Sequence, residues 1–189
     1  LELAARLREG TVKLPPDVPG SLDTDHISDG VAATFPNGCH VAEVEVDPET
    51  GVVRVVRYVA AGDCGTVVNP IVVEGQVRGG VVQGIGQAVF EDTVYDENGQ
   101  LLTGSFMDYA MPRAGDVPDL MVLHRPSPAL TNALGIKGVG EAGCAGSLPA
   151  VMNAVVDALA GHGVRHIDMP ASPARVYAAL RAGAGGEGK

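Results

Sequence analysis

The sequence predicts an α+β fold in which a mixed β-sheet carries its helices on one side. Residues 40–46 alternate between apolar and polar side chains, and residues 52–60 form a second β-rich run. The intervening DPETG is typical of a tight turn, so the two runs are predicted to form a β-hairpin. Farther along, apolar side chains recur at every fourth position from 77 to 89, which predicts a helix over residues 74–92.

Local signals predict the elements that lie around this hairpin and helix. Residues 1–38 form an extended arm, rich in proline and glycine, which begins with a short helix ending at Gly10. After the long helix, Asn98-Gly99 between apolar flanks predicts a hairpin turn. Two further strands are predicted, each ended by a proline, over residues 105–112 and 119–126.

Two more helices complete the predicted fold. One covers residues 147–161, with Ser147 as its N-cap and Gly161 at its end, and the other covers residues 172–183. The last glycine-rich residues, 182–189, are predicted to be a disordered tail. The globular domain is therefore predicted over residues 39–181.

The composition argues against several classes of function. Thirteen basic and 23 acidic residues give a net charge of −10, and the sequence shows no basic patch that would bind nucleic acid. No uncharged apolar run has the length of a membrane helix, so no membrane span is predicted. Three widely spaced cysteines favour a reducing, cytoplasmic compartment over a disulfide framework. The five histidines form no metal-ligand pattern, and no metal site made of side chains is predicted.

Glycine accounts for 26 of the 189 residues, about twice its usual share of ~7%. Many of these glycines lie in the predicted helix over 74–92, where each costs about 1 kcal/mol relative to alanine. One face of that helix carries Gln76, Gly80, Gln83 and Gln87 at helical spacing. This face is either a surface for close helix packing or a wall against a flat ligand with many hydrogen-bonding groups.

The segment LGIKGVGEAGCAG, residues 134–146, places Glu141 among five glycines. Of the residues around Glu141, Lys137 is the one able to form an ion pair with it. A poorly solvated carboxylate has a raised pKa and can act as a general base. The alternative is a solvated glutamate near a helix N-terminus, where an acid is mildly stabilising. A pairing of Glu141 with Asp108 has little support from any motif.

Several motifs resemble one enzyme family. They are residues 74–118, beginning EGQVRGG, and GIKGVGEAGCAGSLPAVMNAVVDAL, together with HVAEVEVDPETG, DCGTVVNP and IDMPASPARV. They resemble the C-terminal part of the large subunit of molybdenum hydroxylases, the xanthine dehydrogenase/aldehyde oxidase family. Within that family they look most like the large chains of aerobic carbon monoxide dehydrogenases. The resemblance covers residues 38–180 and implies the C-terminal portion of a molybdopterin-binding domain.

The resemblance implies a function for the intact protein. Such large subunits bind molybdenum through molybdopterin, in bacteria often as the cytosine dinucleotide, and oxidise a small carbonyl, an N-heterocycle or carbon monoxide with oxygen from water. Glu141 matches the active-site base. The residues matched to cofactor binding are Gln76, Gly75, Gly79, Gly80, Lys137 and Gly138.

The same resemblance implies partners. Electrons would leave through iron–sulfur clusters and FAD on partner subunits, and the remainder of the large subunit would complete the site. This chain alone is therefore expected to be inactive. The alternative function is a noncatalytic domain for subunit assembly, but a scaffold has no need of a lone acid in a glycine loop.

Overall fold

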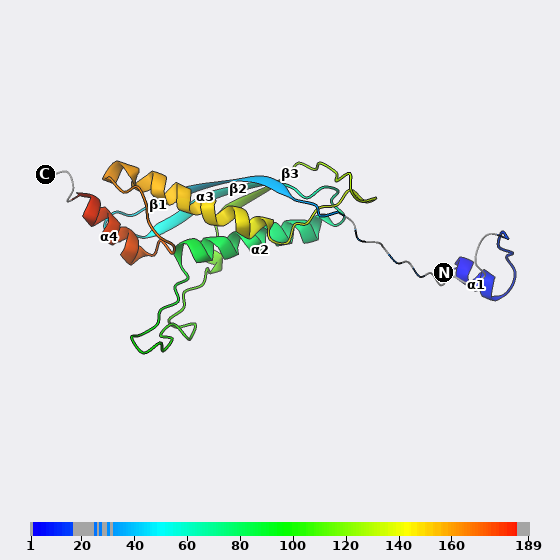
Figure 1. The fold of residues 1–189 in the computed structure, drawn as a ribbon, viewed down its shortest axis with the longest axis horizontal. Coiled ribbons are helices and arrows are strands. Elements are labelled where there is room, and N and C mark those ends of the chain that lie inside the picture. Colours follow the sequence, from blue (N-terminus) through cyan, green and yellow to red (C-terminus); the bar gives the residue numbers. More distant parts are fainter. Residues whose placement is uncertain (1, 17–24, 26, 28–29, 31, 185–189) are drawn as a thin grey trace. The chain divides into compact units, whose positions relative to one another are not determined.

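A computed structural model describes residues 2–16, 25, 27, 30 and 32–184 (Figure 1). The chain divides into two compact units, residues 1–31 and residues 32–189. The first unit contains helix α1, Glu2–Arg8, followed by Gly10 with a φ of 67°. This confirms the short helix predicted at the start of the arm. All other elements belong to the second unit.

The sheet of the second unit has three strands in the order β1-β2-β3. Strands β1, Asn37–Val46, and β2, Val53–Asp63, are antiparallel, and β3, Asp119–His124, pairs in parallel with β2. The turn between β1 and β2 is stabilised by Asp47, whose carboxylate accepts hydrogen bonds from the Glu49 N–H and the Thr50 hydroxyl. The predicted hairpin and the mixed sheet are both confirmed.

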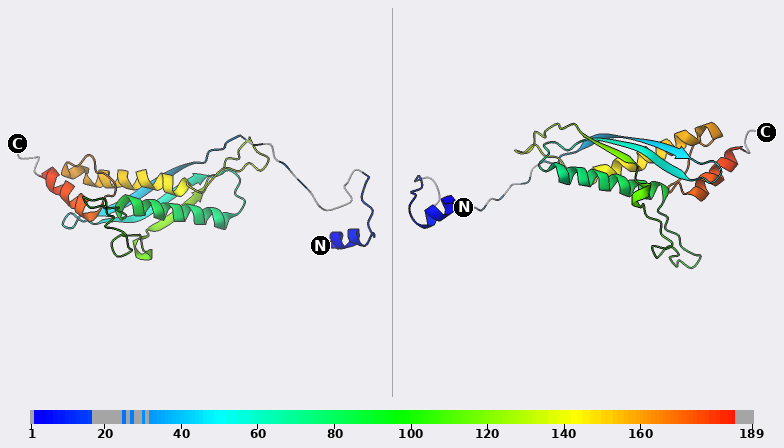
Figure 2. Two further views of the ribbon diagram at one scale, coloured as in Figure 1. Left: turned by 60° about the horizontal axis from the view of Figure 1, so that its bottom comes forward. Right: turned by 180° about the vertical axis from the view of Figure 1, so that it is seen from behind.

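Three helices accompany the sheet: α2, Pro70–Val89; α3, Ala142–Leu159; and α4, Pro173–Ala184. Helices α2 and α3 lie side by side on one side of the sheet (Figure 2). Asn69 caps α2 by accepting hydrogen bonds from the N–H groups of Ile71 and Val72, so this helix begins four residues earlier than predicted. The predicted arrangement of helices on one side of a mixed sheet is confirmed.

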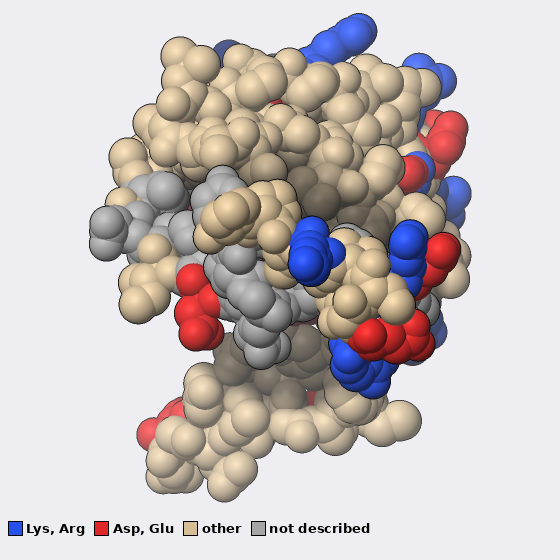
Figure 3. Space-filling model, turned by 90° about the vertical axis from the view of Figure 1, so that its right-hand side faces the viewer, with Lys and Arg blue, Asp and Glu red and all other residues tan. Residues whose placement is uncertain are grey.

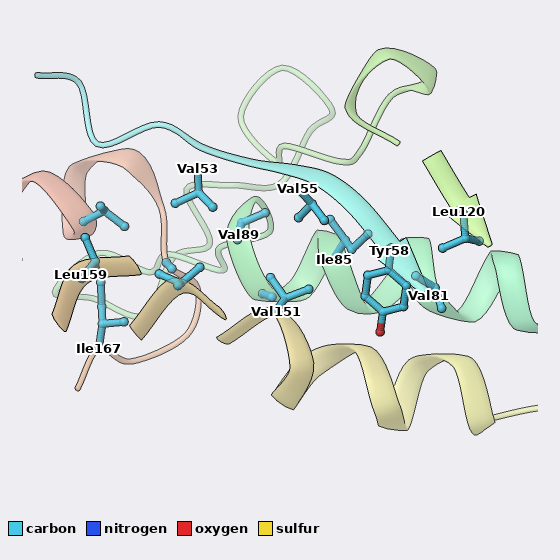
Figure 4. Packing of buried hydrophobic residues seen from close by; sticks show 14 of the residues in the cluster. Val53, Val55, Tyr58, Val81, Ile85, Val89, Leu120, Val151, Leu159 and Ile167 are labelled. Atoms are coloured by element: carbon cyan, nitrogen blue, oxygen red, sulfur yellow. The ribbon is translucent and has the colours of Figure 1, made fainter. Parts of the chain in front are cut away.

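The core lies between the sheet and the helices (Figure 4). The apolar stripe predicted for α2 is buried there, and it meets side chains of β2 such as Val55 and Tyr58. From α3 the buried positions follow a helical period, which places one side of the helix in the core. The buried residues of the two helices include Val77, Val81, Ile85 and Val89 of α2 and Val151, Val155 and Leu159 of α3.

Glycines allow α2 and α3 to approach each other closely. A Cβ atom at Gly80 would lie 2.8 Å from the backbone nitrogen of Cys144, and one at Gly143 would lie 2.5 Å from the carbonyl oxygen of Val77. At Gly84 the same position is taken by the side chain of Ser147. Packing of this kind offsets the low helix propensity of the glycines.

This packing also corrects the predicted start of α3. The helix begins at Ala142, not at Ser147, and Ser147 is buried within it with Pro149 also inside. The low helix propensity of the glycines in residues 142–146 gave no sign of the first turns of α3, because the contact with α2 that stabilises these turns is not a local feature of the sequence. At its other end, α3 passes at Leu159 into a short 3₁₀ helix, Ala160–His162, which ends at Gly163 with a φ of 78° rather than at the predicted Gly161.

The segment between α2 and β3 differs most from prediction. It leaves the core as a long irregular excursion (green in Figure 1) that contains a bridge between Tyr95 and Leu101 around the predicted turn, and a 3₁₀ helix, Ala114–Asp116. The strand predicted over residues 105–112 is wrong. There Ser105 and Asp108 hydrogen-bond each other and form a local turn, an alternative to strand pairing that serine and aspartate offer.

The ends of the predicted domain also shift. Residues 37 and 38, assigned to the arm, belong to β1, and residues 182–184, assigned to the tail, belong to α4. Residues 185–189 of the predicted tail lie outside the described residues. By length and composition one described stretch, Ala142–His162, could cross a membrane. It contains α3, whose buried side chains form part of the core described above.

Candidate functional site

One end of the second unit gathers the residues that the sequence singles out. Strands β2 and β3 run toward this end, and α2 and α3 begin there (Figure 1). Ligands of sheets with parallel strands are commonly bound beyond the carboxyl ends of those strands. Figure 3 draws the described residues as a space-filling model, in which acidic and basic side chains lie close to one another among many uncharged ones.

The second and third turns of α2 present an open surface. Gly75, Gln76 and Gly79 are exposed, and a Cβ at either glycine would meet no atom within 4 Å. Gly80 instead faces α3, so the close approach that it permits within this chain is that of a helix. The interpretation of close helix packing is therefore confirmed at Gly80, and the interpretation of the glutamine-bearing face as a wall against a ligand stays a prediction. Contact between Gly80 and the cofactor stays a prediction.

Glu141 is the N-cap residue of α3, and its carboxylate makes no capping hydrogen bond. Gly143, two residues later, lies against Val77, which follows Gln76 in α2. The structure thus brings Glu141 and Gln76 to the same end of the α2–α3 contact. The expectation that the loop itself leaves this carboxylate poorly solvated is wrong, because Glu141 is exposed. Desolvation would have to come from a group bound over it.

Lys137 does not pair with Glu141. Its ammonium lies 2.5 Å from a carboxylate oxygen of Asp63, and both side chains are largely buried. The hydrogen bond from Lys137, together with those from the N–H groups of Ser127 and Gly65, lowers the pKa of Asp63 to about 2. Sequence reasoning missed Asp63. Its position at the end of β2, just before a glycine-containing turn, is the signal that could have found it.

Between Lys137 and α3 the backbone is open to its surroundings. A Cβ at Gly138 or at Gly140 would meet no atom within 4 Å, and both glycines are exposed. Another group could therefore lie directly against the peptide groups here. Gly75 and Gly79 of α2 are exposed in the same way. We call this set of exposed residues, Gly75, Gln76, Gly79, Gly138, Gly140 and Glu141, the glycine face.

Behind the glycine face, between the sheet and the helices, lies a cavity of about 310 Å³. Its walls are mainly apolar, and Val139 and Ala142, which flank the Gly140-Glu141 pair, belong to them. His40 is one of the polar residues that line the cavity from the sheet, and its Nδ1 lies 2.8 Å from the Tyr58 hydroxyl oxygen. Burial lowers the pKa of His40 and raises that of Tyr58, so both side chains are neutral near pH 7.

Among the described residues, no group of three or more His, Cys, Asp or Glu side chains is placed to hold a metal ion. Cys39, Cys64 and Cys144 are all free thiols. The polar groups that the glycine face offers are an amide, a carboxylate and backbone N–H and C=O groups. Such groups suit a ligand that brings many hydrogen-bonding edges of its own.

Comparisons with known proteins identify the family of the chain. Residues 9–118 match the model of a molybdopterin cofactor-binding domain family. The chain is 45% identical, over 147 residues, to the large subunit of nicotine 6-hydroxylase from Paenarthrobacter nicotinovorans, covering 78% of this chain and 18% of that protein. It is 37% identical, over 167 residues, to the carbon monoxide dehydrogenase large chain of Hydrogenophaga pseudoflava, covering 88% of this chain and 21% of that protein.

Solved structures show the same fold. Reconstituted CO dehydrogenase from Oligotropha carboxidovorans superposes with a TM-score of 0.88 at 33% identity, over 97% of this chain and 22% of that chain. The chain thus spans about a fifth of the length of the relatives that it matches. Gln76 and the α2 glycines lie within the matched family model, whereas Lys137, Gly138 and Glu141 follow it. The chain belongs to the molybdopterin cofactor-binding domain family and corresponds to part of a molybdenum hydroxylase large subunit.

Proposed function

We propose that the glycine face binds the molybdopterin cofactor of a molybdenum-dependent oxidoreductase and that Glu141 is the base of its active site. The observation that carries the proposal is the position of Glu141. Its carboxylate is exposed and makes no capping bond at the start of α3, beside the bare backbone of Gly138 and Gly140 and next to the Gln76 end of α2.

The residues of the glycine face fit such a cofactor. A pterin is flat and has hydrogen-bonding groups along its edges, so it needs a surface without protruding side chains and with amides in reach. Gly75, Gly79 and Gly138 leave that space, because a Cβ at each would point into the open. Gln76 offers both a donor and an acceptor beside them. When bound, the molybdenum centre supplies the redox chemistry that oxidises the substrate with oxygen from water.

Glu141 would hold and move a proton in this reaction. No salt bridge of the described residues engages it, since Lys137 is paired with Asp63. Enclosure of its carboxylate beneath the cofactor and the rest of the large subunit would disfavour the charged form and raise its proton affinity. A carboxylate tuned in this way can take the proton of the attacking oxygen at neutral pH. The backbone of Gly138 and Lys137 would lie along the cofactor.

The names of the relatives indicate a broad class of substrate. Relatives are named for nicotine, an N-heterocycle, and for carbon monoxide, and a further solved structure with 38% identity is named quinoline 2-oxidoreductase from Pseudomonas putida 86. We therefore propose a small carbonyl, an N-heterocycle or carbon monoxide as substrate. The cofactor is proposed to be the cytosine dinucleotide form, in a cytoplasmic enzyme, where the free cysteines stay reduced.

The proposed partners are the remainder of the large subunit and subunits that carry iron–sulfur clusters and FAD. Large apolar side chains on the excursion between α2 and β3 support a covering partner, because Phe106 and Met107 are 84% and 93% exposed. The same observation is what favours the alternative, a domain that serves only assembly. The enzyme function requires Glu141 for turnover and Gln76 for cofactor binding, whereas a domain that serves only assembly requires neither.

The experiment compares three variants of the intact complex that contains this chain. Glu141→Gln should lower turnover by orders of magnitude with molybdenum content near normal. Gln76→Ala should lower the content of molybdenum and pterin. Gln100→Ala, an exposed glutamine outside α2, is the matched control and should change neither. Normal turnover in Glu141→Gln with full cofactor in Gln76→Ala would reject the proposal and favour the assembly function.

A further inference from the structure

Asp63, the last residue of β2, joins three loops at the end of the core where the glycine face lies. Its Oδ1 accepts hydrogen bonds from the backbone N–H groups of Gly65 and Ser127, each 2.9 Å long. Its Oδ2 accepts a hydrogen bond from the Lys137 ammonium, 74 positions away in the sequence. One carboxylate therefore holds the loop after β2, the loop after β3 and the loop that leads to α3.

The burial of this ion pair distinguishes it from a surface pair. The Asp63 and Lys137 side chains are 14% and 12% exposed, whereas those of the Glu43–Arg57 pair on the same sheet are 59% and 71% exposed. The low pKa of Asp63 keeps the pair charged throughout the neutral range. An ion pair shielded from water adds little net stability once desolvation is counted, and in some proteins such a pair selects one geometry. The Asp63–Lys137 pair is therefore expected to act mainly by fixing the geometry of the loops that it joins.

The segment before Glu141 is held at three points. At the first, the Lys137 N–H donates to the Cys64 carbonyl and the Thr66 N–H donates to the Gly135 carbonyl, each at 2.9 Å. At the second, Val139 packs against the core, and at the third, Gly143 lies against α2. The glycines on either side of Val139 have no neighbour at the Cβ position, so these positions gain no restraint from side-chain contacts. The direction of the Glu141 side chain thus depends on the fixed points around it.

We propose that Asp63 is a positioning residue for Glu141, acting through Lys137. The inference rests on the proposed function, because it takes Glu141 to be the base. Catalytic groups need to be held to within about half an ångström, and a displacement of about 1 Å can lower a rate roughly 100-fold. Loss of the Asp63–Lys137 pair would remove one of the restraints on the loop before Gly138 and widen the range of positions open to the Glu141 carboxylate.

The test uses Asp63→Asn in the intact complex, since an asparagine oxygen can still accept from the Gly65 and Ser127 N–H groups while the charge that holds Lys137 is lost. Two quantities are measured. Hydrogen exchange should become faster in the peptide over residues 134–142 and stay unchanged in α4. The kcat per bound molybdenum should fall roughly 10- to 100-fold with little change in KM. In a Glu141→Gln background, Asp63→Asn should lower kcat no further.

Glu43→Gln, which breaks the exposed pair on the same sheet, is the matched control and should change neither quantity. If Asp63→Asn does not fold, Lys137→Met takes its place, because Asp63 then keeps its two backbone bonds. Unchanged exchange, unchanged kcat per molybdenum, or an equal loss in the Glu141→Gln background would overturn the positioning role. Full turnover in Glu141→Gln alone would instead overturn the proposed function on which it rests.

Discussion

Gly143 of α3 lies against Val77 of α2 so closely that a Cβ on Gly143 would sit 2.5 Å from the Val77 carbonyl oxygen. Real Cβ atoms do not approach backbone oxygen to this distance, so one helix would have to move. This contact fixes the start of α3, and with it Glu141, next to the part of α2 that carries Gln76. The glycines therefore have two separate physical roles. Those between α2 and α3 allow the helices to pack closely, and those that face away from this contact leave the helix surface free of side chains.

These two roles predict opposite effects of adding a methyl group. Gly143→Ala should destabilise the protein by about 1–3 kcal/mol, as overpacking of a tight contact does. Gly79→Ala should stabilise it by about 0.5–1 kcal/mol, because its Cβ would enter open space in a helix. Urea unfolding of both variants measures the difference. Equal effects of the two substitutions would show that the inner contact is not as tight as described.

The low pKa of Asp63 predicts how stability depends on acid. Its folded value of about 2 lies below the ordinary aspartate value of about 3.9. The carboxylate therefore adds stability that is fully present above about pH 4 and is lost as pH falls through the folded pKa. The free energy of unfolding of the wild type minus that of Asp63→Asn should be constant from neutral pH down to about 4 and then shrink. A difference that does not change with pH would contradict the assignment.

His40 predicts a second pH effect with its own range. Burial lowers its pKa below the ordinary value of about 6.5, so the unfolded chain binds the proton more readily than the folded one. Stability should therefore fall as pH drops below about 6.5 and level off once the folded His40 is also protonated. His40→Gln should remove this part of the pH dependence of unfolding. NMR titration of the ring provides the check, and a pKa at or above the ordinary value would refute the prediction.

Sequence-based predictions succeeded where the deciding pattern lies within one short segment, and they failed where the deciding contact joins segments far apart in the sequence. The β1–β2 hairpin and the apolar stripe of α2 were predicted because their patterns lie within one short segment. The start of α3 was missed, since the stabilising contact of Gly143 comes from α2 and not from neighbouring residues. The ion pair of Asp63 was missed for the same reason, as its partner Lys137 lies 74 positions away, although the position of Asp63 at the end of β2 was a local signal. Glu141 was found through a motif, yet its exposure could not be predicted without the fold.

The measurement that tests the central claim most directly is the molybdenum and pterin content of Gly79→Val in the intact complex. A Cβ at position 79 meets no atom within 4 Å outside its own turns of α2, so a valine side chain there enters the open space that we assign to the cofactor. Gly161→Val, equally open but at the far end of α3, is the control. We predict that Gly79→Val is folded and depleted of cofactor while Gly161→Val is fully loaded. Full cofactor in a folded Gly79→Val protein would contradict the claim that the glycine face binds it.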